Sequence, residues 1–320
     1  MDHGARNEGE RITVVANPRA GGGRAGEKKD EIARALDRAF ARAKIVWTEG
    51  PGHASELARA AAAESDIVAA LGGDGTCSEV VNGFFRDGKA VSPRVVFTAL
   101  PFGTGGDLVR SLEIPGALDR ALWIAATGTT VPLDVGQLRW SDRDARVFVN
   151  VAGVGANAEV CRRANASSKR FGGRVTFLGA TLATVATFRP RPVRWRWRGP
   201  DGDGEEERET LAGFVANGHY CGAGLWVGKG GSMADGFFDL TMLPGFPARE
   251  LPLYLRRIYD GGLGSISGVR RLRVTSVEVA SEIPIEADGE PLGDGPIAMS
   301  VLPRALHVRG GWLRPPHADL

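Results

Sequence analysis

Three glycine-rich segments carry the residues of this sequence whose types and spacing could do chemistry. They are NPRAGGGRAG at 17–26, GGDGT at 72–76 and PFGTGGD at 101–107. Glycines leave backbone N–H groups open to a ligand, and such loops hold phosphate groups well where a helix begins directly after them. The second and third segments also carry the acids Asp74 and Asp107. Acids beside phosphate-binding loops indicate phosphoryl transfer assisted by Mg²⁺, in which positioning and charge compensation supply most of the catalysis.

Each of these segments also has a simpler interpretation. The spacing G-x-G-x-x-G at 21–26 fits a dinucleotide fingerprint with Glu49 as its ribose acid, but this signal is weak in a chain so rich in glycine. A Walker A loop is excluded because Glu27 stands where the lysine belongs. A turn that only precedes a helix explains the first segment. A turn dipeptide explains Asp74-Gly75, and a helix cap explains Asp107.

The three segments each follow a predicted β-strand. Strands are expected at 12–16, 44–48, 66–71 and 94–100, with helices between them. Strand, loop and helix in repetition indicate a mostly parallel sheet covered on both faces. Because the carboxyl ends of parallel strands share one edge, we expect the three loops to meet there. Thr76 and Glu79 match a T-x-x-E capping box, which predicts that the second helix begins at Thr76.

The pattern changes after Pro132, where short β-rich runs are separated by turn residues. These runs lie at 131–138, 146–151, 193–197, 210–215, 236–243, 272–279 and 297–302. Helices are expected only at about 169–187 and 249–261, so the pattern is typical of an antiparallel β-sandwich. We therefore predict a Rossmann-like, three-layer α/β domain over 1–130 and a β-sandwich domain over 131–302. The final stretch, 303–320, is a candidate to return to the first domain.

One segment of the second domain, RPRPVRWRWR at 189–198, invites two interpretations. Tryptophan and arginine together suit a lipid headgroup boundary. However, Val193, Trp195 and Trp197 alternate with arginines, and PDGDG supplies a turn, which favours a β-hairpin with rings on one face and charges on the other. The hairpin is the preferred interpretation.

Composition excludes several classes of protein. The chain has 320 residues, of which 43% are hydrophobic, and its 40 basic and 38 acidic residues leave a formal charge of +2. A core of normal size is available, so global disorder is excluded, and a polybasic nucleic-acid binder is not indicated. Three widely spaced cysteines suggest neither disulfides nor zinc. With no signal peptide and no long apolar run, we expect a cytoplasmic protein whose contact with a membrane is peripheral.

The motifs together resemble a known family. NPRAGGGRAG, LGGDGTCSEVVNGF and LPFGTGGDLVRSL, in this order, are similar to the diacylglycerol kinase catalytic domain of bacterial lipid kinases, which are relatives of sphingosine and ceramide kinases. The blocks FVNVAGVGANAEV, VANGHYCGAG, SMADGFFDLTML and IPIEADGEPLG extend the resemblance through the second domain, over about 11–310. The fold it implies is that of NAD kinases and diacylglycerol kinases.

The resemblance also implies roles for individual residues. Asp74 and Asp107 would organise a catalytic Mg²⁺ and its water network, and Glu290 would be the general base for a lipid hydroxyl. A second, structural Mg²⁺ would bind Asp235 together with the backbone carbonyls of Ser232 and Phe237. Contacts to ATP would come from Asn17, Pro18, Arg19, Ala20, Gly21, Thr48, Gly73, Asp74, Gly75, Thr76, Glu79 and Thr104.

The residues alone would favour other roles for two of these sites. Asp288-Gly289 is a strong hairpin signal, which would leave Glu290 as an exposed strand residue, and Asp235-Gly236 also fits a simple turn. The chain departs from the family pattern twice. Gly106 stands where an asparagine usually precedes the aspartate of the third loop, and Asn157 stands where an aspartate is frequent.

The resulting hypothesis is a lipid kinase that uses ATP and Mg²⁺ to phosphorylate a hydroxyl of a diacylglycerol-like or sphingoid lipid, with a role in lipid metabolism such as phospholipid biosynthesis. Its partner would be a lipid at the membrane surface, with no nucleic acid, and a homodimer stays open. Two alternatives remain. One is an NAD-kinase-like enzyme for a soluble hydroxyl substrate, which GGDGT alone would also fit. The other is a non-catalytic nucleotide or lipid sensor.

Overall fold

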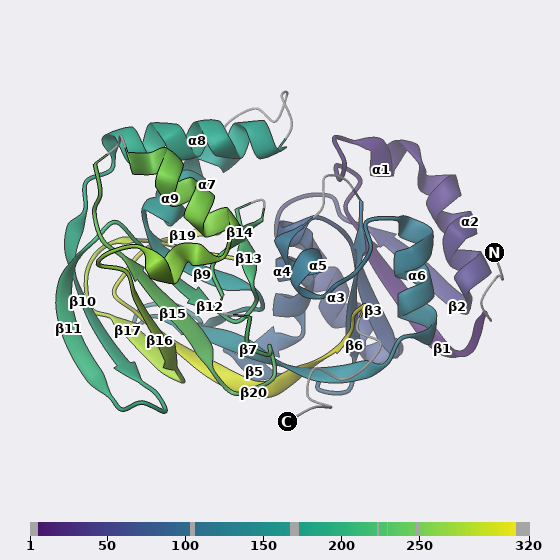
Figure 1. Ribbon diagram of the computed structural model, residues 1–320. Coiled ribbons are helices and arrows are strands. Elements are labelled where there is room, and N and C mark those ends of the chain that lie inside the picture. The colour runs from purple at the N-terminus through teal and green to yellow at the C-terminus, as the bar shows by residue number, and fades with distance from the viewer. Residues whose placement is uncertain are drawn as a thin grey trace. The chain divides into compact units, whose positions relative to one another are not determined.

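The chain divides into two compact units in a computed structural model. The structure describes residues 6–102, 106–166, 173–222, 224–228, 230–247 and 250–311. Unit 1 comprises residues 1–133 and 304–320, and unit 2 comprises residues 134–303 (Figure 1). The end of the chain thus returns to the first unit, and the two units are described one by one below.

Unit 1 is built on a parallel sheet. Its strand order is β20-β6-β3-β1-β2. Residues 304–309 of β20 belong to this unit, and β20 pairs with β6 at His307 and Val308. Every residue of β3 is buried, as expected for a central strand covered on both faces. The other elements are α1 (Arg24–Glu27), α2 (Lys29–Ala39), α3 (His53–Glu64), α4 (Asp74–Gly83), α5 (Asp107–Ser111), α6 (Leu118–Thr127), β4 (Phe85–Arg86) and β5 (Lys89–Ala90). The sheet strands are β1 (Asn7–Ala16), β2 (Phe40–Trp47), β3 (Ile67–Gly72), β6 (Val96–Pro101) and β20 (Ile297–Arg309).

Unit 2 contains an antiparallel six-stranded sheet of order β16-β15-β12-β9-β18-β19. Its strands are β9 (Val151–Gly155), β12 (Ala212–Ala216), β15 (Phe238–Leu243), β16 (Arg270–Val274), β18 (Pro284–Ala287) and β19 (Glu290–Asp294). The other strands are β7 (Thr130–Arg139), β8 (Arg146–Phe148), β10 (Arg191–Arg198), β11 (Gly204–Thr210), β13 (Tyr220–Cys221), β14 (Leu225–Trp226) and β17 (Ser276–Val279). The helices are α7 (Ala156–Ala166), α8 (Gly173–Thr187), α9 (Leu251–Tyr259) and the 3₁₀-helix η3 (Gly262–Ser265). The antiparallel β-sandwich is therefore confirmed.

The core of unit 2 explains the RPRPVRWRWR segment. Val193, Trp195 and Trp197 are buried among residues of β12, β15 and β17, and Trp195 donates its indole N–H to the Thr210 hydroxyl at 3.2 Å. The alternating arginines form ion pairs instead, for example Arg194 with Glu207 at 3.1 Å across the β10–β11 hairpin. The hairpin prediction is confirmed, and these tryptophans face the core rather than a membrane. In the part of the chain that the structure describes, no helix has the length and apolar character needed to span a bilayer.

Helix α7 was not predicted, because its sequence ANAEVCRRANA has a mixed pattern. Within this helix, the buried carboxylate of Glu159 accepts hydrogen bonds from Arg162 (Nη2, 2.7 Å) and Arg163 (Nε, 2.6 Å). The hydrogen bond from Arg162 is the largest cause that lowers the pKa of Glu159, and the bond from Arg163 acts in the same direction. Burial opposes them, and the pKa falls from 4.5 to about 2. The folded state therefore favours the charged form of Glu159 over the neutral form.

We expect Glu159→Gln to lower the free energy of unfolding at pH 7 by about 2 kcal/mol. A lowered pKa gives stability that is present above pH 4.5 and is lost as the pH falls toward 2. The difference between variant and wild type should therefore shrink on acidification, as measured by urea unfolding from pH 7 to pH 3. Glu56→Gln, at an exposed position of α3, is the control. A difference that does not change with pH would contradict this assignment.

Candidate active site

The three glycine-rich loops of unit 1 meet at the carboxyl edge of its parallel sheet, as the strand pattern predicts. The Asn17 amide donates to the Thr76 hydroxyl at 3.3 Å, which joins the first loop to the second. The Phe102 N–H donates to the Gly72 carbonyl at 3.4 Å, which joins the second loop to the third. Residues far apart in the sequence thus form one local site.

The first loop is shaped by three consecutive glycines in the left-handed region. Gly21, Gly22 and Gly23 have φ angles of 63°, 75° and 95°, which other residues adopt at a cost. Asn17 starts the turn by accepting the Arg19 N–H at 2.9 Å. Among the described residues, no acceptor faces the backbone N–H groups of Gly21 and Gly22. These donors are suited to an anionic ligand such as a phosphate.

The expected capping box in the second loop is wrong. Helix α4 begins at Asp74, two residues before Thr76, and Gly73 is its N-cap residue without a side-chain cap. Glu79 instead accepts the backbone N–H of Ala54 at 3.1 Å and so caps the neighbouring helix α3, whose own N-cap residue is Gly52. The local motif was overruled because α3 lacks a capping side chain of its own and packs against α4.

Asp74 links the second loop to the start of α5. Its Oδ2 accepts the Asp107 N–H at 2.9 Å, and its Oδ1 accepts the Leu108 N–H at 3.1 Å. Burial raises the pKa of Asp74, while these two backbone hydrogen bonds and the nearby Arg110 oppose the rise. A carboxylate placed in a desolvated position between two loops is a functional-site candidate, since folding alone would not favour it.

The departure from the family pattern at Gly106 has a structural reason in this chain. In the structure, a Cβ atom at position 106 would lie well inside van der Waals contact with Oδ1 of Asp74. The backbone angles of Gly106, φ −89° and ψ 156°, suit any residue. A side chain at position 106 would therefore displace the Asp74 carboxylate, although the backbone angles would allow it.

The remaining predicted residues of unit 1 lie around these loops. Asp107 is 9% exposed and begins α5, with Arg110 at 3.9 Å from its carboxylate. Thr48 is buried directly after β2, and its N–H donates to the Ala16 carbonyl at 2.9 Å. Thr104 lies outside the described residues. Pro18, Ala20 and Gly75 belong to the first two loops. The contacts of these residues to a nucleotide stay a prediction.

In unit 2, Glu290 follows a tight hairpin turn between β18 and β19. Asp288 and Gly289 have φ angles of 50° and 84°, as in a type I′ turn, which confirms the hairpin expected from the Asp-Gly pair. Glu290 pairs with Ala287 across the turn and lies 3.4 Å from Nη2 of Arg146. The side chains of Glu290 and Arg146 are 31% and 38% exposed, so this ion pair contributes little to stability.

The turn itself is held far more firmly than a hairpin requires. The buried carboxylate of Asp288 accepts backbone N–H groups of Val149 (2.9 Å), Asn150 (2.9 Å) and Val151 (3.2 Å). The Gly289 carbonyl accepts the Asn165 amide at 3.1 Å from α7. The sequence signal for a turn did not reveal these contacts. They fix the position from which Glu290 projects.

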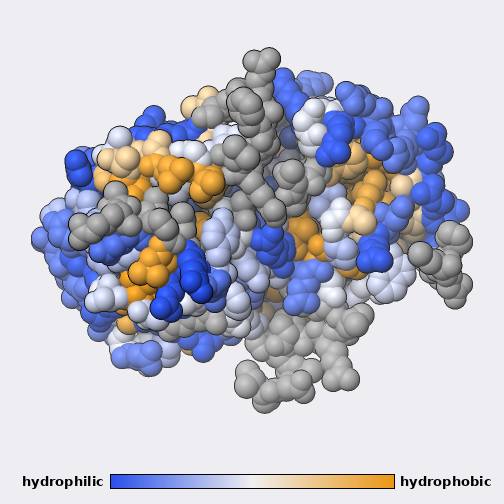
Figure 2. All heavy atoms as spheres, turned by 45° about the horizontal axis from the view of Figure 1, so that its top comes forward, coloured by the Kyte–Doolittle hydropathy of each residue, from blue (hydrophilic) through white to orange (hydrophobic). Residues whose placement is uncertain are grey.

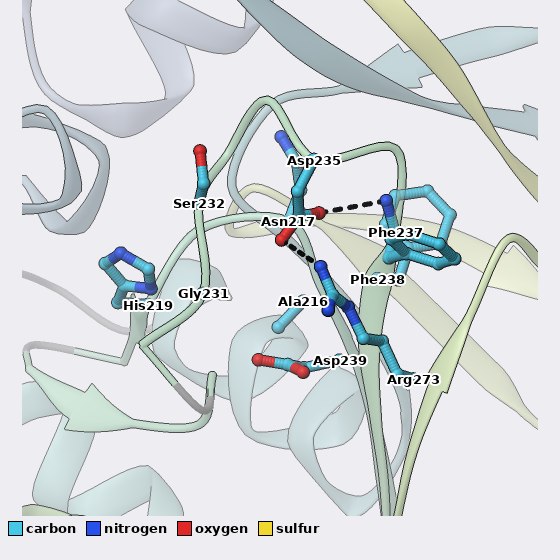
Figure 3. Close-up of a pocket in the computed structure, with 10 residues that line it drawn as sticks. All are labelled: Ala216, Asn217, His219, Gly231, Ser232, Asp235, Phe237, Phe238, Asp239 and Arg273. Carbon is cyan, nitrogen blue, oxygen red and sulfur yellow. Dashed lines mark hydrogen bonds and ion pairs between the residues drawn. The ribbon is translucent and has the colours of Figure 1, made fainter. Parts of the chain in front are cut away.

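The predicted structural metal site lies at a turn of unit 2 that lines a pocket (Figure 3). Asp235 accepts the Phe237 N–H at 3.1 Å, and the guanidinium of Arg273 donates to its other oxygen at 2.5 Å while lying over the Phe237 ring. Ser232 accepts the Ala234 N–H with its hydroxyl oxygen. Arg273 thus supplies a positive charge to one oxygen of Asp235. The metal assignment, which also uses the backbone carbonyls of Ser232 and Phe237, stays a prediction.

Sequence reasoning missed Asp134, which is fully buried beside the same turn. Its Oδ2 accepts the Gly236 N–H at 2.6 Å, and its carbonyl accepts the Asn217 amide at 2.9 Å. The available signal was a single acid inside the otherwise apolar run VPLDVGQL. Buried charges are uncommon, so this residue belongs with the candidates.

The second departure, Asn157, also has a local reason. Its amide donates to the Gly213 carbonyl at 3.0 Å, and it lies with the buried Glu286 against Gly153. An aspartate at this position would place a second carboxylate beside Glu286 and would lose the donor to Gly213. Asparagine therefore fits this interior.

Comparisons with known proteins agree with the motifs. A family model described as "Diacylglycerol kinase catalytic domain" matches residues 11–138, and one described as "YegS C-terminal NAD kinase beta sandwich-like domain" matches residues 150–310. The chain is 29% identical to a diacylglycerol kinase of Mycobacterium tuberculosis (strain H37Rv) over 315 residues, covering 98% of this chain and 97% of that protein.

Two further relatives are similar over most of their length. A probable lipid kinase YegS-like protein of Pseudomonas aeruginosa (strain PAO1) is 29% identical over 293 residues, covering 90% of this chain and 91% of that protein. A crystal structure of a diacylglycerol kinase from Bacillus anthracis superposes with a TM-score of 0.69 at 20% identity, covering 94% of this chain and 97% of that one. The latter shows the shared fold. With both of its halves matched, the chain belongs to the lipid kinase family that joins a diacylglycerol kinase catalytic domain to a YegS-type β-sandwich domain.

Proposed function

We propose that this protein is an ATP- and Mg²⁺-dependent kinase that phosphorylates a hydroxyl group of a diacylglycerol-like or sphingoid lipid. The observation that carries the proposal is the Asp74 carboxylate, which bridges two glycine-rich loops. It lies on the same sheet edge as the open N–H groups of the first loop. An acid beside phosphate-binding donors suits a nucleotide whose phosphates are bound together with a cation.

The nucleotide would lie along the first two loops. Gly21 and Gly22 would donate backbone N–H groups to its phosphates, and Asn17 and Thr76 would line the same edge. Asp74 and Asp107 would hold Mg²⁺, directly or through water. Asp74 fits this role because its Oδ2 accepts the Asp107 N–H and its Oδ1 accepts the Leu108 N–H, whereas a carboxylate oxygen can accept two hydrogen bonds. When bound, the ion would neutralise charge that develops on the phosphates.

Glu290 would accept the proton of the lipid hydroxyl. The hydroxyl oxygen forms a bond to the γ-phosphorus, the bond from that phosphorus to the β–γ bridging oxygen breaks, and ADP leaves. The anchored Asp288-Gly289 turn supports this role because general-base catalysis requires a fixed geometry, and the weak ion pair with Arg146 would not prevent Glu290 from binding the proton.

The test uses the purified full chain with Mg²⁺ and γ-labelled ATP. A panel of diacylglycerols and sphingoid bases is presented in mixed vesicles, and NAD and soluble alcohols are presented without lipid. We expect label to appear in a lipid, and Asp74→Asn to remove it. Asp119→Asn, which changes an aspartate whose side chain is 80% exposed on α6, should leave the activity unchanged.

Two outcomes would overturn the proposal. Labelling of a soluble substrate alone would indicate an NAD-kinase-like enzyme. Nucleotide binding without turnover on any member of the panel would indicate a sensor. In both cases Asp74→Asn still reports whether the loops of unit 1 bind the nucleotide.

A further inference from the structure

Helix α8 presents an uncharged surface to solvent. Leu178 and Leu182 are 49% and 50% exposed and lie one turn apart on the same side, together with the exposed Ala183 and Ala186. A helix on the surface of a globular unit normally carries charged residues on its exposed side. Here no charged residue occurs between 175 and 188. The exposed side of α8 is therefore apolar without being covered.

Helix α9 continues this character. Leu253 and Tyr259 are 54% and 50% exposed. Tyr254 of the same helix stacks on Phe246, which packs on the core that also takes Phe177 of α8. Both helices therefore rest on one core in unit 2. Apolar side chains gather over them in the space-filling view (upper left of Figure 2). We call Leu178, Leu182, Leu253 and Tyr259 the α8–α9 face.

The charged residues within these two helices are all basic. The segments 173–191 and 251–259 contain five arginines (174, 189, 191, 256 and 257), whereas Glu250 and Asp260 flank α9 and Arg256 lies 3.5 Å from Asp260. Arg256 and Arg257 are exposed on α9. By contrast, α2 mixes Lys29, Asp30, Glu31 and Asp37 as an ordinary solvated helix does. An apolar surface bordered by arginines is complementary to a layer of anionic headgroups above acyl chains.

A second copy of the chain is a poorer occupant. A two-fold interface places the same patch on both partners, so the arginines of one copy would approach those of the other. Anionic lipid would instead attract these arginines while the leucines enter the acyl boundary.

We propose that the α8–α9 face is the surface by which this protein docks on a membrane that contains anionic lipid. The inference rests on the proposed lipid kinase function, because an enzyme that acts on a membrane lipid must reach the bilayer surface. It assigns that contact to leucines and arginines outside the candidate catalytic residues. Docking should therefore be separable from chemistry.

The experiment measures cosedimentation of the full chain with vesicles of phosphatidylcholine, with and without about one third phosphatidylglycerol. We expect tighter binding to the anionic vesicles, and weaker binding as salt increases. Leu178→Gln with Leu182→Gln should reduce the affinity for anionic vesicles at least tenfold. Arg256→Gln with Arg257→Gln should remove most of the preference for anionic lipid. Trp123→Gln on α6, where the ring is 50% exposed, is the matched control and should bind as wild type.

Activity is measured in parallel on a short-chain lipid dissolved below its micellar concentration. The leucine variant should keep wild-type turnover on this substrate and lose activity only on vesicles. Two results would overturn the docking proposal when the wild type still turns over the soluble lipid. One is a leucine variant that binds vesicles as tightly as the wild type, and the other is a wild type that binds neither kind of vesicle. A dimer that the leucine variant dissociates would also overturn it. If the wild type instead showed no turnover of the soluble lipid, the proposed function would be overturned.

Discussion

Replacing Glu290 by glutamine is expected to lower kcat by about 10²–10⁴-fold, the range typical of losing a general base. Glutamine keeps the size and polarity of the side chain but cannot take up the hydroxyl proton. Folding should hardly change, because the partly exposed ion pair of Glu290 with Arg146, at 3.4 Å, contributes little to stability. Initial rates on vesicle-borne lipid, with thermal unfolding measured alongside, provide the measurement.

The control for this variant is Glu282→Gln, which removes the same charge from an exposed position just before β18. It should retain full activity. If Glu290→Gln keeps more than half of the wild-type kcat, Glu290 is not the base. If it loses activity together with affinity for ATP, the residue acts on the nucleotide instead. Unchanged nucleotide affinity with a collapsed kcat is the result that the base role requires.

Much of the fold was readable from the sequence, because each element carried its own pattern. The buried run IVAALG predicts a central strand, and the alternation in VRWRW predicts a half-buried one. The Asp288-Gly289 pair predicts a two-residue hairpin, since glycine and aspartate tolerate positive φ. Once the first strands are taken as parallel, the meeting of the three loops follows from the geometry of the sheet.

The partners of the site's carboxylates could not be read in this way. Glu79 caps a helix that begins 26 residues earlier, and Asp288 binds N–H groups of residues 149–151. Nothing in the local sequence marks these acceptors. These carboxylates accept backbone N–H groups that have no partner within their own element. Which N–H groups these are depends on how the elements pack together in the folded chain. The capping-box motif therefore assigned Glu79 to the wrong helix, and the turn motif gave no partner for Asp288.

Gly106 is a second position where the local sequence and the tertiary surroundings lead to different expectations. By residue type, an asparagine at position 106 would be a better N-cap for α5 than glycine, by a few tenths of a kcal/mol. By its surroundings, any side chain there would displace the carboxylate that already satisfies the first N–H groups of α5. The two considerations predict opposite outcomes for the same substitution.

Gly106→Asn is accordingly expected to reduce phosphoryl transfer by about 10²-fold, since a displacement of about 1 Å in a positioned catalytic group has this effect. The new Cβ would push Oδ1 of Asp74 away from the Leu108 N–H, and Oδ2 would lose its alignment with the Asp107 N–H. The substitution restores the residue typical of the family and should nevertheless impair this chain. Turnover and Mg²⁺ dependence are measured together, because a displaced Asp74 should also raise the Mg²⁺ concentration needed for half-maximal rate.

Gly116→Asn is the matched control, because an added Cβ at position 116 meets no atom within 4 Å. It lies shortly after α5 and should leave turnover and Mg²⁺ dependence unchanged. If Gly106→Asn were as active as wild type, the close approach of Asp74 would not matter for catalysis. If it were more stable and more active, capping by residue type would outweigh the packing around Asp74. A loss confined to Gly106→Asn, with a raised Mg²⁺ requirement, would instead link the rate to the position of this carboxylate.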